Sequence, residues 1–198
     1  MILQALYEYY QRKAADPEST IAPRGLEWKE IPYLILIDKK GKFLELQDTT
    51  EGVGKQKRAK KYLVVKSKGR TGSNSWQTAN VFWDHFGYVL AQPKNTDDKG
   101  MPKALDDAAK QHKSFVQEVR QLAEIHPSNE DIQAVAGFYD NPENLQHIKT
   151  DPLWEECIKK DGTNISFKIA GQNTIVAENP DVTSSTCLLY TSDAADEL

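Results

Sequence analysis

The sequence predicts an α+β fold, in which strands come first, helices follow and strands return. Residues 31–37 (IPYLILI) form a short apolar run, long enough for a buried strand and too short for a helix. Between residues 103 and 126, apolar side chains recur at steps of three and four, which is the spacing of an amphipathic helix. A further apolar run follows at residues 165–170. This order favours an α+β domain over a doubly wound sheet.

The first elements are predicted to be a helix and an antiparallel hairpin. Residues 2–13 place apolar and aromatic side chains on one helical face. Asp16-Pro17 is expected to end this helix, because proline pushes the preceding residue out of the helical region. The strand at 31–37 and a second strand at 43–46 are joined by a turn, in which Gly41 is free to take a positive φ.

The rest of the chain is predicted to contain one more early strand, a loop, a helical region and a closing hairpin. Residues 62–65 are expected to be a strand, and residues 67–78, rich in Gly, Ser, Thr and Asn, a loop. The dense aromatic residues of segment 80–91 are expected to hold this loop on the core. Helices follow over about 103–149, and a C-terminal β-hairpin, with residues 174–177 as its second strand, closes the domain.

The composition is that of a folded protein. Hydrophobic residues make up 39% and charged residues 27% of the 198 residues, which is apolar enough for a packed core. No apolar run approaches the roughly 20 residues that cross a bilayer, and charges follow Met1 too soon for a secretory signal. Cys157 and Cys187 fit neither a zinc pattern nor a disulfide framework. We therefore expect a cytoplasmic protein with free thiols and no membrane contact.

Positive charge is concentrated in residues 55–70, which we call the basic segment. It holds eight of the 25 Lys and Arg residues and no Asp or Glu, so the rest of the chain holds 17 basic and all 29 acidic side chains. Nucleic acid requires such charge density, because each neutralised phosphate releases condensed counterions. A solvated, flexible loop is the alternative interpretation. The candidate phosphate-binding residues are Lys55, Lys57, Arg58, Lys60, Lys61, Lys66, Lys68 and Arg70.

Polar residues beside the basic segment are candidates for finer contacts. Thr71, Asn74 and Asn80 bear the amide and hydroxyl groups that bind base edges and phosphates. Ordinary loop composition is the simpler explanation for any one of them. Trp76 lies in the same loop and is a candidate for stacking on a base, whereas the other aromatic residues nearby are assigned to the core.

The sequence contains no pattern typical of a catalytic site. There is no GxSxG, P-loop or GxGxxG motif. The four histidines form no HExxH or HxH pair, so we predict neither a metal site nor a cofactor. Asp84-His85 reverses the His-Asp order of some nucleases and lacks further ligands. We predict a non-catalytic, nucleic-acid-binding protein, with a structural scaffold and a metal-dependent nuclease as alternatives.

Several ordered blocks resemble one family, the large subunit of the type I-C CRISPR interference complex (Cascade, Dvulg subtype). The opening MILQALYEYYQR and the element IAPRG at 21–25 are similar to its start. Residues 70–90, with Arg70-Thr71, Asn80-Val81-Phe82-Trp83-Asp84 and Tyr88-Val89-Leu90, resemble an aromatic block of the family. The stretches HKSFVQEVRQLAE and ISFKIAG are also similar, whereas Ala91 stands where the family usually has Gly.

The resemblance implies a non-catalytic subunit of an RNA-guided antiviral complex in the cytoplasm. The N-terminal region of such a subunit lies beside the subunit that holds the 5′ end of the guide RNA. It helps to recognise the motif flanking the target, parts the duplex, and binds the DNA duplex or the displaced strand. Its implied partners are target double-stranded DNA, guide RNA, the other Cascade subunits and a recruited helicase-nuclease that cleaves the DNA. The basic segment would then supply phosphate contacts, and Asn80, with Thr71 or Asn74, would reach the motif or its backbone.

The resemblance also implies that the chain is one piece of a longer protein. Family members are much longer, so we expect residues 1–185 to be a partial N-terminal domain of the large subunit. Residues 187–197 read like the translation of a transposon sequencing adaptor. We therefore expect residues 186–198 to be a foreign, disordered tail.

Overall fold

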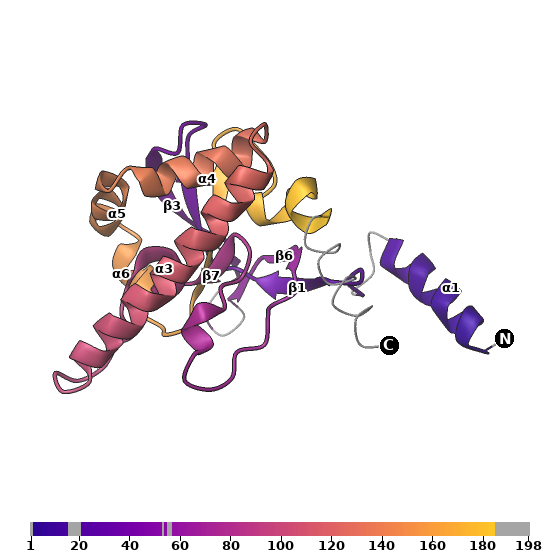
Figure 1. The fold of residues 1–198 in the computed structure, drawn as a ribbon, viewed down its shortest axis with the longest axis horizontal. Coiled ribbons are helices and arrows are strands. Elements are labelled where there is room, and N and C mark those ends of the chain that lie inside the picture. The colour runs from indigo at the N-terminus through magenta and orange to yellow at the C-terminus, as the bar shows by residue number, and fades with distance from the viewer. Residues whose placement is uncertain (1, 16–20, 53, 55–56, 185–198) are drawn as a thin grey trace.

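A computed structural model describes residues 2–15, 21–52, 54 and 57–184 of the protein. Within these ranges the chain forms the expected α+β fold, with a central sheet, two small sheets and a layer of helices (Figure 1). Lys55, the Asp16-Pro17 helix stop and the expected foreign tail at 186–198 lie outside the described residues.

The central sheet has four strands in the order β3-β2-β8-β7. Strand β2 (Tyr33–Ile37) pairs antiparallel with β3 (Phe43–Asp48), which confirms the predicted hairpin. On its other edge β2 pairs in parallel with β8 (Asn164–Ile169), and β8 pairs antiparallel with β7 (Trp83–His85). Four of the five side chains of β2 are buried, as an interior strand of the sheet requires, which explains its unbroken apolar run.

The hairpin turn is fixed by one carboxylate and one glycine. The Oδ1 atom of Asp38 accepts hydrogen bonds from the backbone N–H groups of Lys40 and Lys42, at 2.8 and 2.9 Å. Gly41 adopts φ +81°, as predicted. A Cβ atom at Gly41 would lie only 2.3 Å from the carbonyl oxygen of Ala134, so glycine also permits the close approach of the next helical layer.

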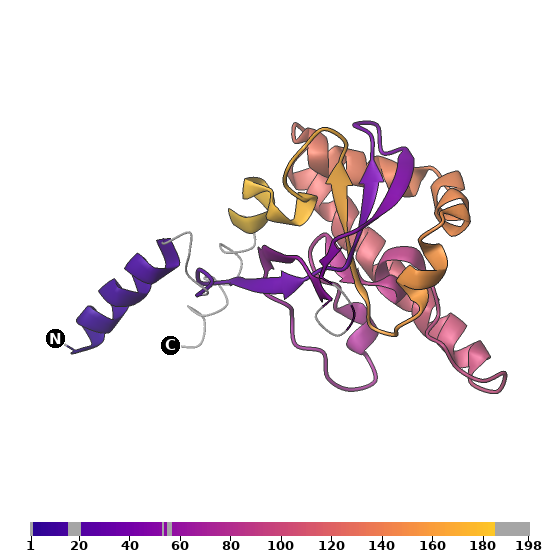
Figure 2. The same cartoon turned by 180° about the vertical axis from the view of Figure 1, so that it is seen from behind.

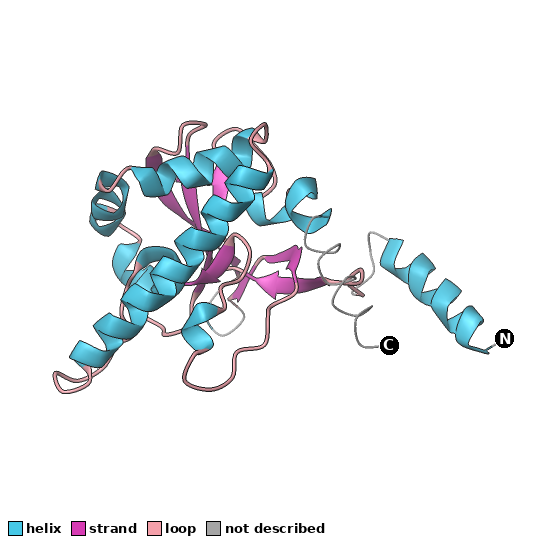
Figure 3. Ribbon diagram, in the orientation of Figure 1, coloured by secondary structure: helices cyan, strands magenta, loops and turns pink. Residues whose placement is uncertain are grey.

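Helices cover one face of the central sheet, as the opposite views in Figures 1 and 2 show. Helix α3 (Met101–Ile125) and helix α4 (Glu130–Asp140) are the main helices of this layer, and Figure 3 separates them from the strands. Helix α4 contributes Phe138, whose ring lies 5.3 Å from that of Phe167 on β8. The short helix α5 (Glu143–His147) completes the predicted helical region, whereas α6 (Trp154–Ile158) lies beyond its predicted end at about residue 149.

The long helix α3 confirms the predicted amphipathic stripe except at its start. Phe115, Val119 and Leu122 are buried as expected, but Leu105 is 52% exposed. Ala104 takes the buried position in the first turn instead. A helix has 3.6 residues per turn, so counting back from Phe115 in whole turns reaches Ala108 and Ala104 on the buried face. Leu105 is therefore turned toward solvent.

The closing hairpin predicted at 165–177 is reduced to its first strand and one antiparallel bridge. Residues 164–169 are a strand, but Ile175 makes only an isolated bridge to Lys168 before a 3-10 turn, η4 (Val176–Glu178). The reason is that both edges of β8 already have partners, β2 on one side and β7 on the other. Only the end of β8 beyond β7 is open to a returning segment.

Two small sheets flank the central one. Strand β6 (Lys61–Val65) is the predicted third strand, and it pairs antiparallel with β1 (Leu26–Glu30), which was not predicted. Strand β4 (Thr50–Glu51) pairs with β5 (Arg58–Ala59). Both small sheets therefore place parts of the basic segment in extended backbone.

Helix α1 (Ile2–Ala15) confirms the predicted opening helix and projects from the body of the domain (Figures 1 and 2). Its apolar side chains, including Ile2, Leu3 and Leu6, are exposed. Within the described ranges, no helix has both the length and the apolar composition that crossing a bilayer requires.

A buried asparagine joins the hairpin to the helical layer and provides a stability test. The Oδ1 atom of Asn144 accepts from the Phe43 N–H at 3.0 Å, and its amide donates to the carbonyl oxygens of Gly41 and Phe138 at 2.9 Å each. We predict that Asn144→Ala lowers the free energy of unfolding by at least about 2 kcal/mol, because buried backbone groups lose their partners. Urea unfolding measures this, and the exposed Asn173→Ala should change it by less than about 0.5 kcal/mol.

Candidate nucleic-acid interface

Four exposed cations of the basic segment follow one another closely in the chain, and we call this set the cationic course. Arg58 lies in β5, Lys60 follows it, Lys61 begins β6 and Lys66 follows β6. None of the four makes an ion pair with another described residue. The Nζ atom of Lys60 lies 5.2 Å from the centre of the Tyr62 ring, a cation–π contact that keeps the full positive charge on the ammonium group. These side chains are the accessible positive charge of the predicted interface.

Two other lysines of the basic segment are paired with carboxylates of the same chain. Lys57 Nζ lies 3.1 Å from Asp48 Oδ2, and Lys68 Nζ lies 3.1 Å from Glu118 Oε1 on α3. Burial alone would raise the pKa of Asp48, but hydrogen bonds from Thr50 and the charge of Lys57 hold that pKa below its ordinary value. Lys57 and Lys68 are therefore less available to phosphate than the unpaired cations.

Arg70, predicted as a phosphate contact, instead has a structural role. Its two terminal nitrogens donate to both carboxylate oxygens of Asp84, with Nη1 at 3.0 Å from Oδ1. Its Nε donates to the carbonyl oxygen of Thr78 at 2.7 Å, and the guanidinium carbon lies 4.1 Å from the centre of the Tyr88 ring. The N–H groups of the guanidinium are thus bonded to Asp84 and Thr78, and one of its faces lies on Tyr88. We therefore remove Arg70 from the candidate phosphate contacts.

Asp84 is the acceptor at the centre of this arrangement. Its side chain is almost fully buried and also accepts hydrogen bonds from the backbone N–H groups of Asn80 (3.0 Å) and His85 (2.8 Å). Four donors therefore satisfy the two carboxylate oxygens and compensate the cost of burying their charge. The oxygens of this carboxylate are thus engaged by Arg70 and by two backbone N–H groups. Among the residues that the structure describes, no three His, Cys, Asp or Glu side chains form a possible metal site.

The predicted polar contacts fall into two groups. Thr71 and Asn74 are exposed in the loop 67–78 and remain candidates. Asn80 is only 5% exposed, so the prediction that its side chain reaches a base or a neighbouring backbone is wrong for this conformation. Its backbone N–H bonds to Asp84, which draws Asn80 into the core, and its Oδ1 atom has no hydrogen-bond partner among the described residues.

The aromatic residues of segment 80–91 hold the loop on the core, as predicted. Phe82, Trp83, Phe86 and Tyr88 are buried, and the Tyr88 hydroxyl donates to the Ser75 carbonyl oxygen at 2.9 Å. Helix α2 (Phe86–Leu90) ends at Ala91, which adopts φ +53°. This left-handed conformation suits glycine better than alanine, so Ala91 ends the helix in a backbone conformation that is unfavourable for its side chain.

A basic pocket of about 350 Å³ adds a residue that sequence analysis did not select. It lies between the segment before β1 and the segment after β6, and Arg24 lines it together with Lys66 and Lys68. Arg24 is 42 residues from Lys66 in the chain, so no local pattern joins them. The antiparallel pairing of β1 with β6 brings them together.

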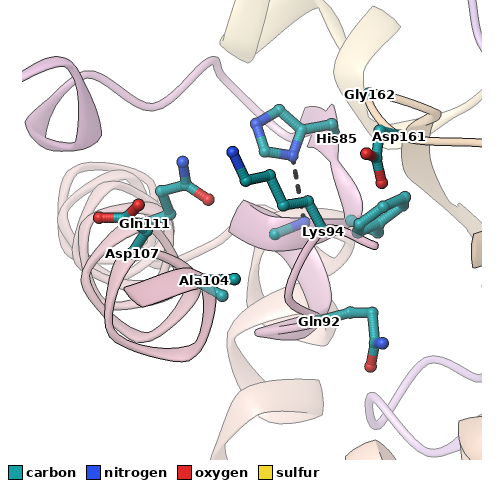
Figure 4. Close-up of a pocket in the computed structure, with 11 residues that line it drawn as sticks. His85, Gln92, Lys94, Ala104, Asp107, Gln111, Asp161 and Gly162 are labelled. Carbon is teal, nitrogen blue, oxygen red and sulfur yellow. Dashed lines mark hydrogen bonds between the residues drawn. The ribbon is translucent and has the colours of Figure 1, made fainter. Parts of the chain in front are cut away.

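A second, mixed pocket of about 250 Å³ lies beside α2 (Figure 4). Figure 4 shows the Lys94 side chain reaching across it between His85 and Gln111. His85 Nδ1 accepts a hydrogen bond from the Gly87 N–H at 3.2 Å. Burial lowers the pKa of His85; the charge of Asp84 raises this pKa and the charge of Arg70 lowers it, both to a smaller extent. Sequence analysis missed this pocket because its residues come from separate segments of the chain.

The comparison with known families identifies the chain. A sequence model described as CRISPR-associated protein (Cas_Csd1) matches residues 6–197, which is most of the chain. The protein belongs to the Cas_Csd1 family. No curated protein matches it. Membership confirms the predicted CRISPR association and gives this Cas_Csd1 protein a role in CRISPR defence. The type I-C subtype and the large-subunit role remain predictions.

Removing one partner of the buried ion pair tests its structural role. We predict that Asp84→Ala in this Cas_Csd1 protein lowers the free energy of unfolding by about 3 kcal/mol, because Arg70 is left partly buried without its acceptor. The control is Asp106→Ala, which breaks the exposed pair with Lys110 and should cost less than about 0.5 kcal/mol. Equal, small losses in urea unfolding would contradict the structural role of Asp84.

The two histidines around Tyr88 predict an acid-sensitive fold. Burial lowers the pKa of His112, although its hydrogen bond with the Tyr88 carbonyl opposes this, and burial also lowers the pKa of His85. The unfolded chain therefore binds more protons below about pH 6.5, so the free energy of unfolding falls as pH drops through that range. We predict a smaller fall between pH 7.5 and 5.5 in the double variant His85→Gln/His112→Gln, measured by urea unfolding. An unchanged fall would contradict this assignment.

Proposed function

We propose that this chain is part of the large subunit of a type I-C surveillance complex and holds target DNA without cleaving it. The observation that supports this is the course of four exposed, unpaired cations, Arg58, Lys60, Lys61 and Lys66, in a protein of a CRISPR-associated family. In RNA-guided complexes base pairing reads the target sequence, whereas protein side chains hold backbones and read the short flanking motif.

The length of this cationic course suits a duplex. If residues 58–66 were fully extended, they would span at most about 26 Å at a rise of about 3.3 Å per residue. That length corresponds to roughly eight base pairs at 3.4 Å per pair. Side chains that meet only phosphates give affinity and register without sequence preference. The basic pocket with Arg24 lies at the Lys66 end of the course and extends it.

The proposed partners follow from this role. They are target double-stranded DNA, guide RNA, the other Cascade subunits, and a recruited helicase-nuclease that performs the cleavage in the cytoplasm. Thr71 and Asn74 are the proposed contacts near the flanking motif, since both are exposed beside the cationic course. We assign no cofactor and no metal to the chain. The metal-dependent nuclease is the less favoured alternative, because Asp84 is committed to Arg70.

A structural scaffold is the second candidate function, and helix α1 favours it. The apolar side chains of α1 are exposed, among them Ile2 and Leu3, although a helix of this kind is stabilised mainly by burying its apolar face. Another subunit of the complex is a suitable partner for that face. The two candidates predict different effects of removing positive charge.

We predict that replacing Arg58, Lys60, Lys61 and Lys66 by Ala weakens binding to a short DNA duplex and flattens its salt dependence. If each cation neutralises one phosphate, the slope of log K against log salt should fall in magnitude by about 3 to 4. A fluorescence-anisotropy titration of the purified chain at several salt concentrations measures both quantities.

The matched control removes the same charge elsewhere. Lys99, Lys103, Lys149 and Lys160 are exposed and lie outside the basic segment, so their replacement by Ala should change the slope by less than 1. Equal effects of the two quadruple variants would mean that only net charge matters. Indifference of duplex binding to the first variant would favour the scaffold.

A further inference from the structure

A groove of about 620 Å³ runs between the 3-10 turn η2 (Ser75–Gln77) and the outer face of α3. Figure 1 shows the long loop that contains η2 lying beside α3. We call this hollow the Trp76 groove. The residues used below are Trp76 and Gln77 from the turn, and Lys113, Gln117 and Gln121 from the helix.

Helical spacing places three of the side chains that line the groove on one face of α3, beside Lys110, Ser114 and Glu118. Lys113, Gln117 and Gln121 follow one another at steps of four, so they share one face of α3, and all three are exposed. The buried residues Phe115, Val119 and Leu122 occupy the opposite face and attach the helix to the core. The wall therefore presents long amide side chains and a cation, and no aliphatic side chain is among the described residues that line the groove.

Charge pairing leaves one cation free at the wall. Lys110 pairs with Asp106 at 2.6 Å, and Glu118 pairs with Lys68 at 3.1 Å. Lys113 makes no ion pair with any residue that the structure describes. The local charge is thus weakly positive, with a single ammonium group available to an anion.

Trp76 faces this wall from a turn that is held in place. The Tyr88 hydroxyl bonds to the carbonyl oxygen of Ser75, and Arg70 bonds to that of Thr78, so both ends of η2 are tied to the core. The indole of Trp76 is half-buried. Within the described chain it stacks on no other ring, and its N–H group makes no hydrogen bond. A large aromatic face is therefore preorganised at the edge of a polar groove.

We propose that the Trp76 groove binds an unpaired strand of nucleic acid, with one base stacked on the Trp76 indole and the adjacent phosphate beside Lys113. Every base offers a π-face, and the glutamine amides both donate and accept, so the site tolerates any sequence. This site is distinct from the cationic course along β5 and β6. This inference rests on the proposed function in one respect, that the ligand is a nucleic acid.

The lining excludes two other ligand classes. Bases within a duplex cover one another's faces, so a duplex cannot stack on an indole without being opened. An amphipathic helix of a partner protein would need an apolar groove, whereas Gln77, Gln117 and Gln121 line this one. An unpaired strand supplies both the exposed base face and the phosphate that the groove requires.

The test uses the full chain with a single-stranded oligothymidylate and a duplex of equal length. Trp76→Ala is expected to weaken single-strand binding by roughly 5- to 150-fold, the effect of removing one stacking platform, and Trp76→Phe should restore most of it. Duplex binding should change less than twofold. Thermal unfolding of each variant verifies that the fold is retained.

Two further variants make the test independent of Trp76. Lys113→Glu changes an exposed side chain and should weaken single-strand binding at low salt. Trp28→Ala is the matched control, because Trp28 is an exposed tryptophan that lies on β1, outside the groove. Single-strand affinity that survives both Trp76→Ala and Lys113→Glu would overturn the inference, as would an equal loss in Trp28→Ala.

The results separate this inference from the proposed function. Suppose single-strand binding ignores Trp76 while duplex binding still depends on the four cations of β5 and β6. The groove assignment then fails and the proposed function stands. If single-strand binding is unchanged by the Trp76 and Lys113 variants, and duplex binding is unchanged by the variant that lacks the four cations, both the inference and the proposed function fail.

Discussion

The ion pair between Arg70 and Asp84 is the constraint on which the rest of the surface depends. Asp84 lies in the edge strand β7 of the central sheet, and Arg70 lies at the far end of the basic segment. Their bidentate contact brings the loop between them back onto the core, where Tyr88 supports the guanidinium and bonds to the loop backbone. A buried carboxylate with four donors is costly to disturb, so the two ends of the loop are held in place.

This constraint divides the positive charge of the chain by role. Lys57, Lys68 and Arg70 face carboxylates of the same chain, and their charge holds strands, loop and helix together. The cations between them remain exposed along β5 and β6. A protein with an overall net charge of −4 therefore keeps a localised positive surface, and repulsion from its many carboxylates elsewhere would favour one orientation of an approaching polyanion.

The sequence predicted most elements of the fold and the location of the basic segment, but not which cations are free. The β2–β3 hairpin, the stripe of α3 and the aromatic support near Tyr88 depend on local periodicity and composition, which a sequence displays directly. Arg70 and Asn80 were assigned to the surface because their partner, Asp84, is recognisable only after folding. The pairing of β1 with β6 and the occupied edges of β8 are likewise properties of topology, so β1 and the failed closing hairpin were not foreseen.

The attachment of the loop at both ends leaves its tip unconstrained by the core. Gly72, Ser73 and Asn74 are exposed, and a Cβ atom at Gly72 would meet no neighbour within 4 Å. Changes of length or sequence at the tip therefore need not propagate into the sheet. Such a tip is a natural place for relatives to diverge in ligand preference, and for an experimenter to insert an epitope or attach a dye without perturbing folding.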